Sequence, residues 1–234
     1  MKPTARPQLA GSNHARVALV AAICATLAAG CAALKPEASP TPPSYYSLDA
    51  SGGAPAPAQR TQRPQYTSAG ATILVTAPQS TAGFDSQRII YLRQAHKLEY
   101  FAHSEWVDPP ARMIAPLIVT ALDATGAFRA VVSSPGSSSG DLRLDTEVLL
   151  LQQEFTTNPS QVRFALRASL SEEGTRRVVA TRDIEVLRPS PSEDPYGGVQ
   201  AANAAVRTVL ERLAAFCAES AVQWQSSRRT PPAR

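Results

Sequence analysis

The sequence predicts an α+β domain: a mostly antiparallel sheet with two helices packed on one face. Three long stretches between residues 142 and 186 alternate apolar and polar side chains, which is typical of strands with one buried and one solvent-exposed face. Two further stretches, 108–126 and 195–223, repeat apolar residues at helical spacing, so each predicted helix has an apolar face to pack against the sheet. We expect a single domain over residues 70–224, which is an ordinary domain size.

The chain opens with a stretch that resembles the signal peptide of a bacterial lipoprotein. Three basic residues precede an uncharged apolar run over 17–29. That run suits the core of a signal peptide and is too short to span a bilayer, which needs about 20 residues. Small residues at 28–30 lead to Cys31, whose thiol can take a diacylglyceryl group. We therefore expect residues 1–30 to be removed and Cys31 to carry covalent lipid.

Two alternatives to lipidation stay open. In the usual lipoprotein pattern a leucine stands three residues before the cysteine, whereas here Ala28 holds that place and Leu27 lies one position further back. The leader could then be an ordinary secretory signal or an uncleaved anchor. Labelling with a fatty-acid analogue separates these cases, since only lipidation would label Cys31.

The charge and the cysteines exclude some classes of protein. Removing the three basic residues of the leader from the 23 in the chain leaves 20, against 19 acidic residues, so the remaining charge is close to zero. A nucleic-acid-binding domain would be strongly basic, and we expect no nucleic-acid partner. With Cys31 lipidated, Cys217 has no partner for an intramolecular disulfide, and it is expected to be a small buried apolar side chain.

Residues 31–69 are expected to form a tether between the anchor and the domain. Residues 32–69 contain seven prolines among many Ala, Ser and Gln residues, a composition that buries too little apolar surface to fold alone. Tyr45, Tyr46 and Leu48 interrupt this composition. Because such side chains are unfavourable in water, we expect this patch to dock on the domain or on a partner.

The first half of the domain should contain short strands and one helix. Strands are expected at residues 73–75, 88–93, 97–102 and near 128–132. The helix over 108–126 has Asp108 as its expected N-cap, prolines in its first turn and Gly126 at its end. Pro116 lies inside the helix and should kink it.

The second half should contain three strands and the last helix. The strands at 142–150, 161–170 and 178–186 are separated by turn sequences that suit hairpins. Arg182 is an exception to the alternation, because it is a charged residue at a position expected to be buried. The helix should begin after Asp194 and end near residue 223. The basic stretch 225–234 is expected to be a disordered tail.

No group of residues suggests catalysis or metal binding. After Cys31 the sequence has two histidines, His96 and His103, and neither belongs to a recognisable catalytic or zinc-binding pattern. Glu99 and Glu105 stand six positions apart, which is only a weak signal for paired catalytic carboxylates. We therefore predict that the protein is not an enzyme, and that it has no cofactor apart from the lipid on Cys31 and no metal site.

Four sequence features carry a resemblance to a known family. They are the aromatic pair at 45–46, the Arg-Ile-Ile-Tyr strand at 88–91, the Tyr-Phe-Ala sequence at 100–102 followed by Trp106, and the prolines at 109–110. Together they resemble the ABC-type transport auxiliary lipoprotein family, which includes the PqiC-type outer-membrane lipoproteins. The resemblance runs over about residues 31–218.

The resemblance implies a partner of a transporter that contains an ATPase, a permease and an MCE-domain protein. Such systems move lipids or other hydrophobic molecules between the inner and outer membranes of Gram-negative bacteria. Tyr45, Tyr46, Tyr100 and Trp106 are candidate partner-binding residues, although ordinary packing would also explain Tyr100 and Trp106. Self-association into a homo-oligomer is left open.

The expected location is the outer membrane, facing the periplasm. Ala32 follows Cys31, at the position where an aspartate would favour retention in the inner membrane. The competing functions are an envelope assembly or scaffold lipoprotein unrelated to transport, and a periplasmic enzyme. Genes for an MCE-domain protein and a permease beside this one would favour transport.

Overall fold

The structure is a computed structural model that describes residues 42–50, 70–135 and 139–229. Cys31, the predicted signal peptide and most of the predicted tether lie outside the described residues. The strands are β1 Ser44–Tyr46, β2 Thr72–Val75, β3 Gln79–Ser80, β4 Arg88–Gln94, β5 Lys97–Trp106, β6 Ala130–Ser133, β7 Leu142–Glu154, β8 Gln161–Glu172 and β9 Val178–Pro189. The helices are α2 Pro110–Ala124 and α3 Pro195–Arg229.

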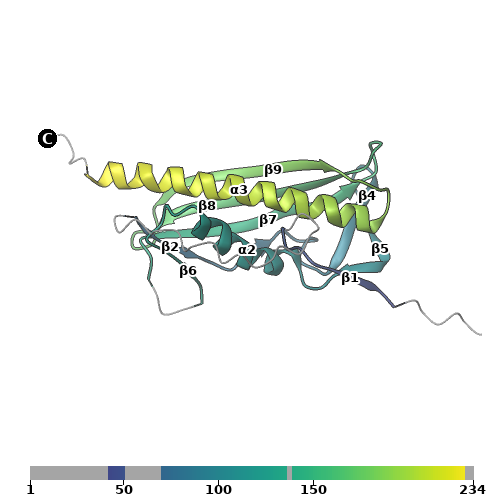
Figure 1. The fold of residues 1–234 in the computed structure, drawn as a ribbon, viewed down its shortest axis with the longest axis horizontal. Helices are drawn as coiled ribbons and strands as arrows, with labels where there is room; N and C mark the ends of the chain where they lie inside the picture. The colour runs from purple at the N-terminus through teal and green to yellow at the C-terminus, as the bar shows by residue number, and fades with distance from the viewer. Residues whose placement is uncertain (1–41, 51–69, 136–138, 230–234) are drawn as a thin grey trace, which may run out of the picture. The chain divides into compact units, whose positions relative to one another are not determined.

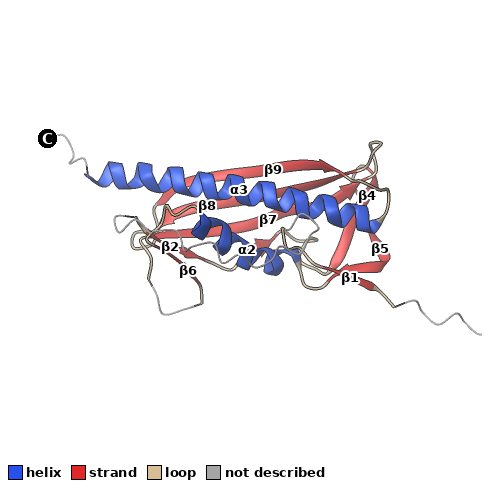
Figure 2. Ribbon diagram, in the orientation of Figure 1, coloured by secondary structure: helices blue, strands red, loops and turns tan. Residues whose placement is uncertain are grey.

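The strands form one mixed sheet, and both helices lie on the same face of it (Figures 1 and 2). β7, β8 and β9 form an antiparallel meander, and β4 and β5 form an antiparallel hairpin. β2, β3 and β4 each pair with β7 in parallel. β1 pairs in parallel with β5, and β6 pairs in parallel with β2. The α+β class with two helices on one face is confirmed, and the sheet contains parallel pairings that the alternation did not predict.

The three long strands follow the predicted alternation, with two local departures. Pairing between β7 and β8 is irregular between Val148 and Leu150, so the alternation shifts by one residue and Leu151 is buried where Leu150 was expected. On β9, Val178 was expected to face the core but is 60% exposed. Arg182, the charged exception, stacks on Phe216 of α3 with its guanidinium carbon 4.7 Å from the ring centroid. It therefore covers the core edge with its side chain while its charge stays in water.

The helix α2 forms where the prolines and the apolar spacing predicted it. Its N-cap is Pro109, without a side-chain cap, so the expectation that Asp108 would cap it is wrong. The helix continues through Pro116, and Gly126 follows its end with φ at 63°. A backbone conformation with positive φ favours glycine, which explains why the helix ends there.

The helix α3 starts at the predicted residue and ends later than predicted. Asp194 accepts a hydrogen bond from the backbone N–H of Gly197 through Oδ1 at 2.7 Å, as an N-cap does. The helix then runs to Arg229, so residues 225–229 are helical and the predicted tail begins too early. Arg228 lies over the Trp224 ring at 4.9 Å and donates to Glu172 Oε1 at 2.9 Å. These contacts tie the last turns to β8. Residues 230–234 lie outside the described part of the chain.

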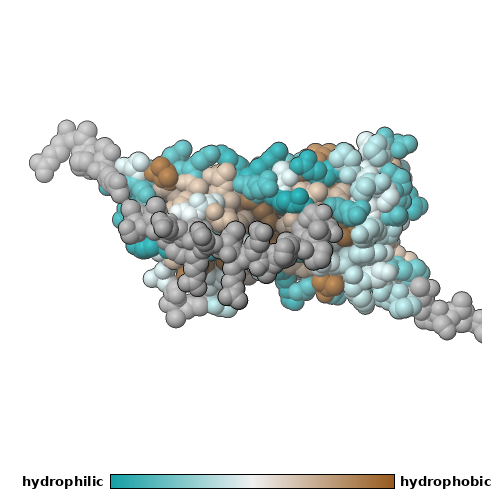
Figure 3. Space-filling model, in the orientation of Figure 1, coloured by the Kyte–Doolittle hydropathy of each residue, from teal (hydrophilic) through white to brown (hydrophobic). Residues whose placement is uncertain are grey.

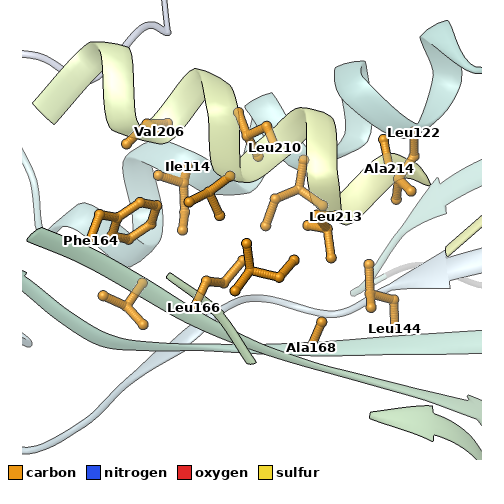
Figure 4. Packing of buried hydrophobic residues seen from close by; sticks show 14 of the residues in the cluster. Ile114, Leu122, Leu144, Phe164, Leu166, Ala168, Val206, Leu210, Leu213 and Ala214 are labelled. Carbon is orange, nitrogen blue, oxygen red and sulfur yellow. The ribbon is translucent and has the colours of Figure 1, made fainter. Parts of the chain in front are cut away.

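The core lies between the sheet and the two helices (Figure 4). The side chains that meet there include Leu144 of β7, Phe164, Leu166 and Ala168 of β8, Ile114 and Leu122 of α2, and Val206, Leu210, Leu213 and Ala214 of α3. Cys217 is fully buried among them, as expected, and burial raises the pKa of its thiol to about 12. No helix within the described ranges is long and apolar enough to cross a membrane.

Candidate docking surface

A short segment at the start of the folded part, residues 42–50, attaches to the edge of the sheet; we call it the strap. Its strand β1 pairs in parallel with the end of β5, with Tyr45 opposite Glu105 and Tyr46 opposite Trp106. The backbone N–H of Val107 also donates to the carbonyl of Tyr46 at 2.8 Å. The aromatic patch that interrupts the predicted tether therefore docks on the domain itself.

The strap continues from the sheet onto the helix α3. Leu48 is buried against the core, with 4% of its surface exposed. Beyond it, Asn203 Oδ1 accepts hydrogen bonds from the backbone N–H groups of Asp49 and Ala50, and Asn203 Nδ2 donates to the carbonyl of Ser47. Arg207 Nε donates to the carbonyl of Ala50 at 2.9 Å. One apolar anchor and four hydrogen bonds thus hold the strap on the helix.

Three tyrosines surround a pocket of about 450 Å³ where the strap crosses the first turns of α3. Tyr45 and Tyr196 are 57% and 55% exposed, and the rings of Tyr46 and Tyr196 lie 6.3 Å apart. Gln200, Asn203 and Arg207 supply polar groups to the same pocket. Exposed tyrosines with polar neighbours are typical of protein interaction sites, because each ring offers a rigid apolar face and a hydroxyl. We call this the tyrosine pocket.

The start of α3 decides where Tyr196 stands. Because Asp194 caps the helix, Tyr196 falls in its first turn, beside the strap. The hydrogen bonds from the Gly197 backbone and the Ser192 hydroxyl lower the pKa of Asp194. Tyr196 was not predicted from the sequence. Its signal was an aromatic residue directly after the N-terminal proline of a helix, at a position outside the apolar stripe.

The structure separates the four residues predicted to bind a partner. Tyr45 and Tyr46 line the tyrosine pocket, whereas Tyr100 does not. Tyr100 is 40% exposed on β5, and the Arg88 guanidinium carbon lies 4.8 Å from its ring centroid. Trp106 is 3% exposed and belongs to the core, which is the ordinary packing left open as the alternative. Its ring stabilises the fold beneath β1 and is not available on the surface.

His96 and His103 both lie on the β4–β5 hairpin, and neither lines the tyrosine pocket. His96 occupies the turn between β4 and β5 with φ at 66°, and His103 is exposed on β5. Within the ranges 42–50, 70–135 and 139–229, no three His, Cys, Asp or Glu side chains are placed so that they could hold a metal ion.

Comparison with known proteins identifies relatives of this chain. A family model described as the ABC-type transport auxiliary lipoprotein component matches residues 46–214. The crystal structure of a Xanthomonas campestris protein is similar with a TM-score of 0.62 and 24% identity, covering 71% of this chain and 93% of that one. A second, uncharacterized protein has a TM-score of 0.57 and 11% identity, with 76% and 99% of the two chains covered. No curated protein matches the sequence. At these identities the two structures support the fold alone.

Proposed function

This chain belongs to the ABC-type transport auxiliary lipoprotein family, and we propose from that premise that it is the membrane-anchored docking component of an MCE-type transport system. In this proposal Cys31 carries lipid, and the folded domain binds an MCE-domain protein of a complex with an ABC permease and ATPase. The system moves lipids or other hydrophobic molecules between the inner and outer membranes. The domain acts by binding and not by catalysis.

The observation that carries the docking role is the tyrosine pocket. The strap holds Tyr45 and Tyr46 on a rigid sheet edge and helix, so the exposed rings are preorganised for a partner and lose little conformational freedom on binding. Cys31 and Pro42 are eleven positions apart in the sequence, and such a length of chain spans at most roughly 40 Å. A lipid on Cys31 would therefore keep the pocket close to the membrane surface.

Co-purification from envelope membranes tests this function. The wild-type chain should retain the MCE-domain protein, and the double variant Tyr45→Ala, Tyr196→Ala should lose at least tenfold of it. Val178→Ala, which removes an equally exposed apolar side chain from β9, is the control and should retain it. The variant Tyr100→Ala tests separately whether Tyr100, a predicted partner-binding residue outside the pocket, contributes to retention of the MCE-domain protein. Failure of the wild-type chain to retain an MCE-domain protein, with Cys31 lipidated, would contradict the proposal.

We propose the outer membrane, facing the periplasm, as the location. Membrane fractionation tests it: the wild-type chain should sediment with outer-membrane markers, and Ala32→Asp should shift it towards the inner membrane. Recovery of wild-type chain in the inner-membrane fraction would overturn this assignment and leave the docking role open to its own test.

A further inference from the structure

An apolar groove of about 520 Å³ lies between α2 and α3. Leu117, Ala121 and Ala124 of α2 form one wall, and Leu210, Ala214 and Ala215 of α3 form the other. Figure 3 shows hydrophobic surface along the middle of this face, with hydrophilic atoms along the border above it. The small alanine side chains leave the space open. A groove of this volume is within the range of small-molecule sites.

The groove and the tyrosine pocket adjoin each other at the end of the strap. Asp49 and Arg207 line both of them, and Glu211, one turn after Arg207 on α3, lines the groove. The Arg207 side chain is fixed by its hydrogen bond to the Ala50 carbonyl. The junction therefore presents the Arg207 guanidinium and the Glu211 carboxylate, next to the apolar groove and the tyrosine pocket.

We propose that groove and junction together bind a zwitterionic phospholipid, with one acyl chain in the groove and the headgroup at the junction. The phosphate lies against Arg207, whose guanidinium geometry suits phosphate oxygens. The ammonium lies towards Glu211. A purely anionic headgroup would meet the Glu211 carboxylate unfavourably, whereas a headgroup with both charges complements Arg207 and Glu211. This inference rests on the proposed lipid-transport function for the choice of a lipid over other amphiphiles.

The walls of the groove favour an acyl chain over an extended peptide. Between Leu117 and Ala124, and between Arg207 and Ala215, both walls are α-helical, so their backbone N–H and C=O groups already bond within the helices. An extended peptide in the groove would leave its own backbone groups without partners, which is costly. An acyl chain has no such groups and benefits from the apolar contact alone.

Photocrosslinking in cells tests the proposal on the full chain. A photoreactive amino acid replaces Ala215, which is exposed and lines the groove, or Val222 two turns later on α3, which does not line it. Both positions fall in one tryptic peptide, residues 213–228, which is separate from the peptide that carries Cys31. Mass spectrometry should find a phospholipid adduct on this peptide for position 215, at least tenfold more than for position 222.

Two second-site variants locate the ligand. Ala124→Trp, which fills the opposite wall, should abolish the adduct at position 215, and Arg207→Gln should lower its yield several-fold. With a photoreactive fatty alcohol added to membranes, Arg207→Gln should leave labelling unchanged, because that probe has no phosphate. Absence of lipid at position 215, or a crosslink there to residues 51–69 or to another protein, would overturn the proposal.

The outcomes distinguish this inference from the function on which it rests. If the MCE-domain protein co-purifies but position 215 gives no lipid, the lipid site is wrong and the docking role stands. If position 215 gives lipid but no MCE-domain protein is retained, the docking role is wrong and the lipid site stands.

Discussion

Asn203 and Asp49, 154 residues apart in the sequence, are joined by a hydrogen bond of 2.9 Å from the Asp49 backbone N–H to Asn203 Oδ1. The same carboxamide also accepts from Ala50 and donates to Ser47, so one side chain satisfies three backbone groups of the strap. The position of the tyrosine pocket and of its junction with the groove therefore depends on Asn203.

Asn203→Ala should release the strap from α3. Each partly exposed hydrogen bond contributes about 0.5–1.5 kcal/mol, so the loss of three should cost about 1–3 kcal/mol locally. Hydrogen exchange of the amides of residues 47–50 should become at least tenfold faster, while β7 and β8 keep their protection. Gln200→Ala, one turn earlier in the same pocket, is the control. Unchanged exchange at 47–50 in Asn203→Ala would mean that Leu48 and β1 hold the strap without the carboxamide.

Gly198→Ala should destabilise the fold because of one contact. A Cβ at this position would collide with the Gln153 carboxamide oxygen, and Gln153 is 2% exposed and donates to Ser160 Oγ at 3.1 Å. We expect a loss of about 1–3 kcal/mol in urea unfolding. Gly174→Ala, where nothing lies within 4 Å of the added carbon, should cost much less. When Gln153 is already replaced by Ala, Gly198→Ala should cost less unfolding free energy than in the wild-type chain. An equal cost in both backgrounds would exclude the collision with Gln153 as its cause.

The cap at Asp194 should make stability depend on pH. The hydrogen bond from Gly197 lowers the pKa of Asp194 in the folded state. This contribution is therefore present above the carboxyl's unfolded pKa, near 3.9, and is lost as the pH falls through the lower folded pKa. Urea midpoints measured from pH 6 down to pH 2.5 should show this loss in the wild-type chain.

Two substitutions separate the charge of Asp194 from its hydrogen bond. Asp194→Ser keeps a capping oxygen without a titrating group, so its stability should depend less on pH between 2.5 and 5. Asp194→Ala lacks both and should already be less stable at pH 6. Equal pH dependence in wild-type and Asp194→Ser chains would show that other carboxyl groups account for the acid loss.

Cys217 should be unreactive while the protein is folded. The thiolate is the reactive form, and the buried thiol has its pKa raised to about 12. At pH 8 a maleimide should leave the peptide of residues 213–228 unlabelled in the native chain and label it fully in urea. Rapid native labelling would indicate that the helix opens locally at this turn.

Trp106→Ala should lower the stability of the domain without removing a direct contact with a partner. The ring is 3% exposed in the core, and truncation of such a side chain costs about 3–5 kcal/mol. Thermal unfolding measures this loss. If Trp106→Ala weakened partner binding at unchanged stability, the residue would have a surface role that its burial does not suggest.

The sequence predicted element types well where one local pattern governed them. Period-two alternation located β7, β8 and β9, and apolar residues at helical spacing located α2 and α3. Two of the errors fell where a tertiary contact competed with the pattern. The irregular pairing after Val148 moved burial from Leu150 to Leu151, and the contacts of Arg228 with Trp224 and Glu172 accompany a helix longer than predicted.

The candidate surfaces were predicted only in part. Tyr45 and Tyr46 stood out because aromatic residues are unfavourable in a Pro-rich segment, and they do lie on the domain. Tyr196 and the groove between the helices could not be predicted, because residues from β1, α2 and α3 meet there after folding. Lipidation at Cys31, outside the described residues, stays a prediction.

The amino-acid pattern alone thus determined the long strands, the helices and the aromatic patch, since propensity, capping and periodicity act over a few neighbouring residues. Folding in three dimensions decided which strands pair in parallel, that Trp106 is buried while Tyr45 is exposed, and that Arg207 stands between a tyrosine pocket and an apolar groove. Those outcomes depend on residues that are far apart in the sequence, 157 positions in the case of Arg207 and Ala50, whose contacts are formed only when the sheet and helices pack around a common core.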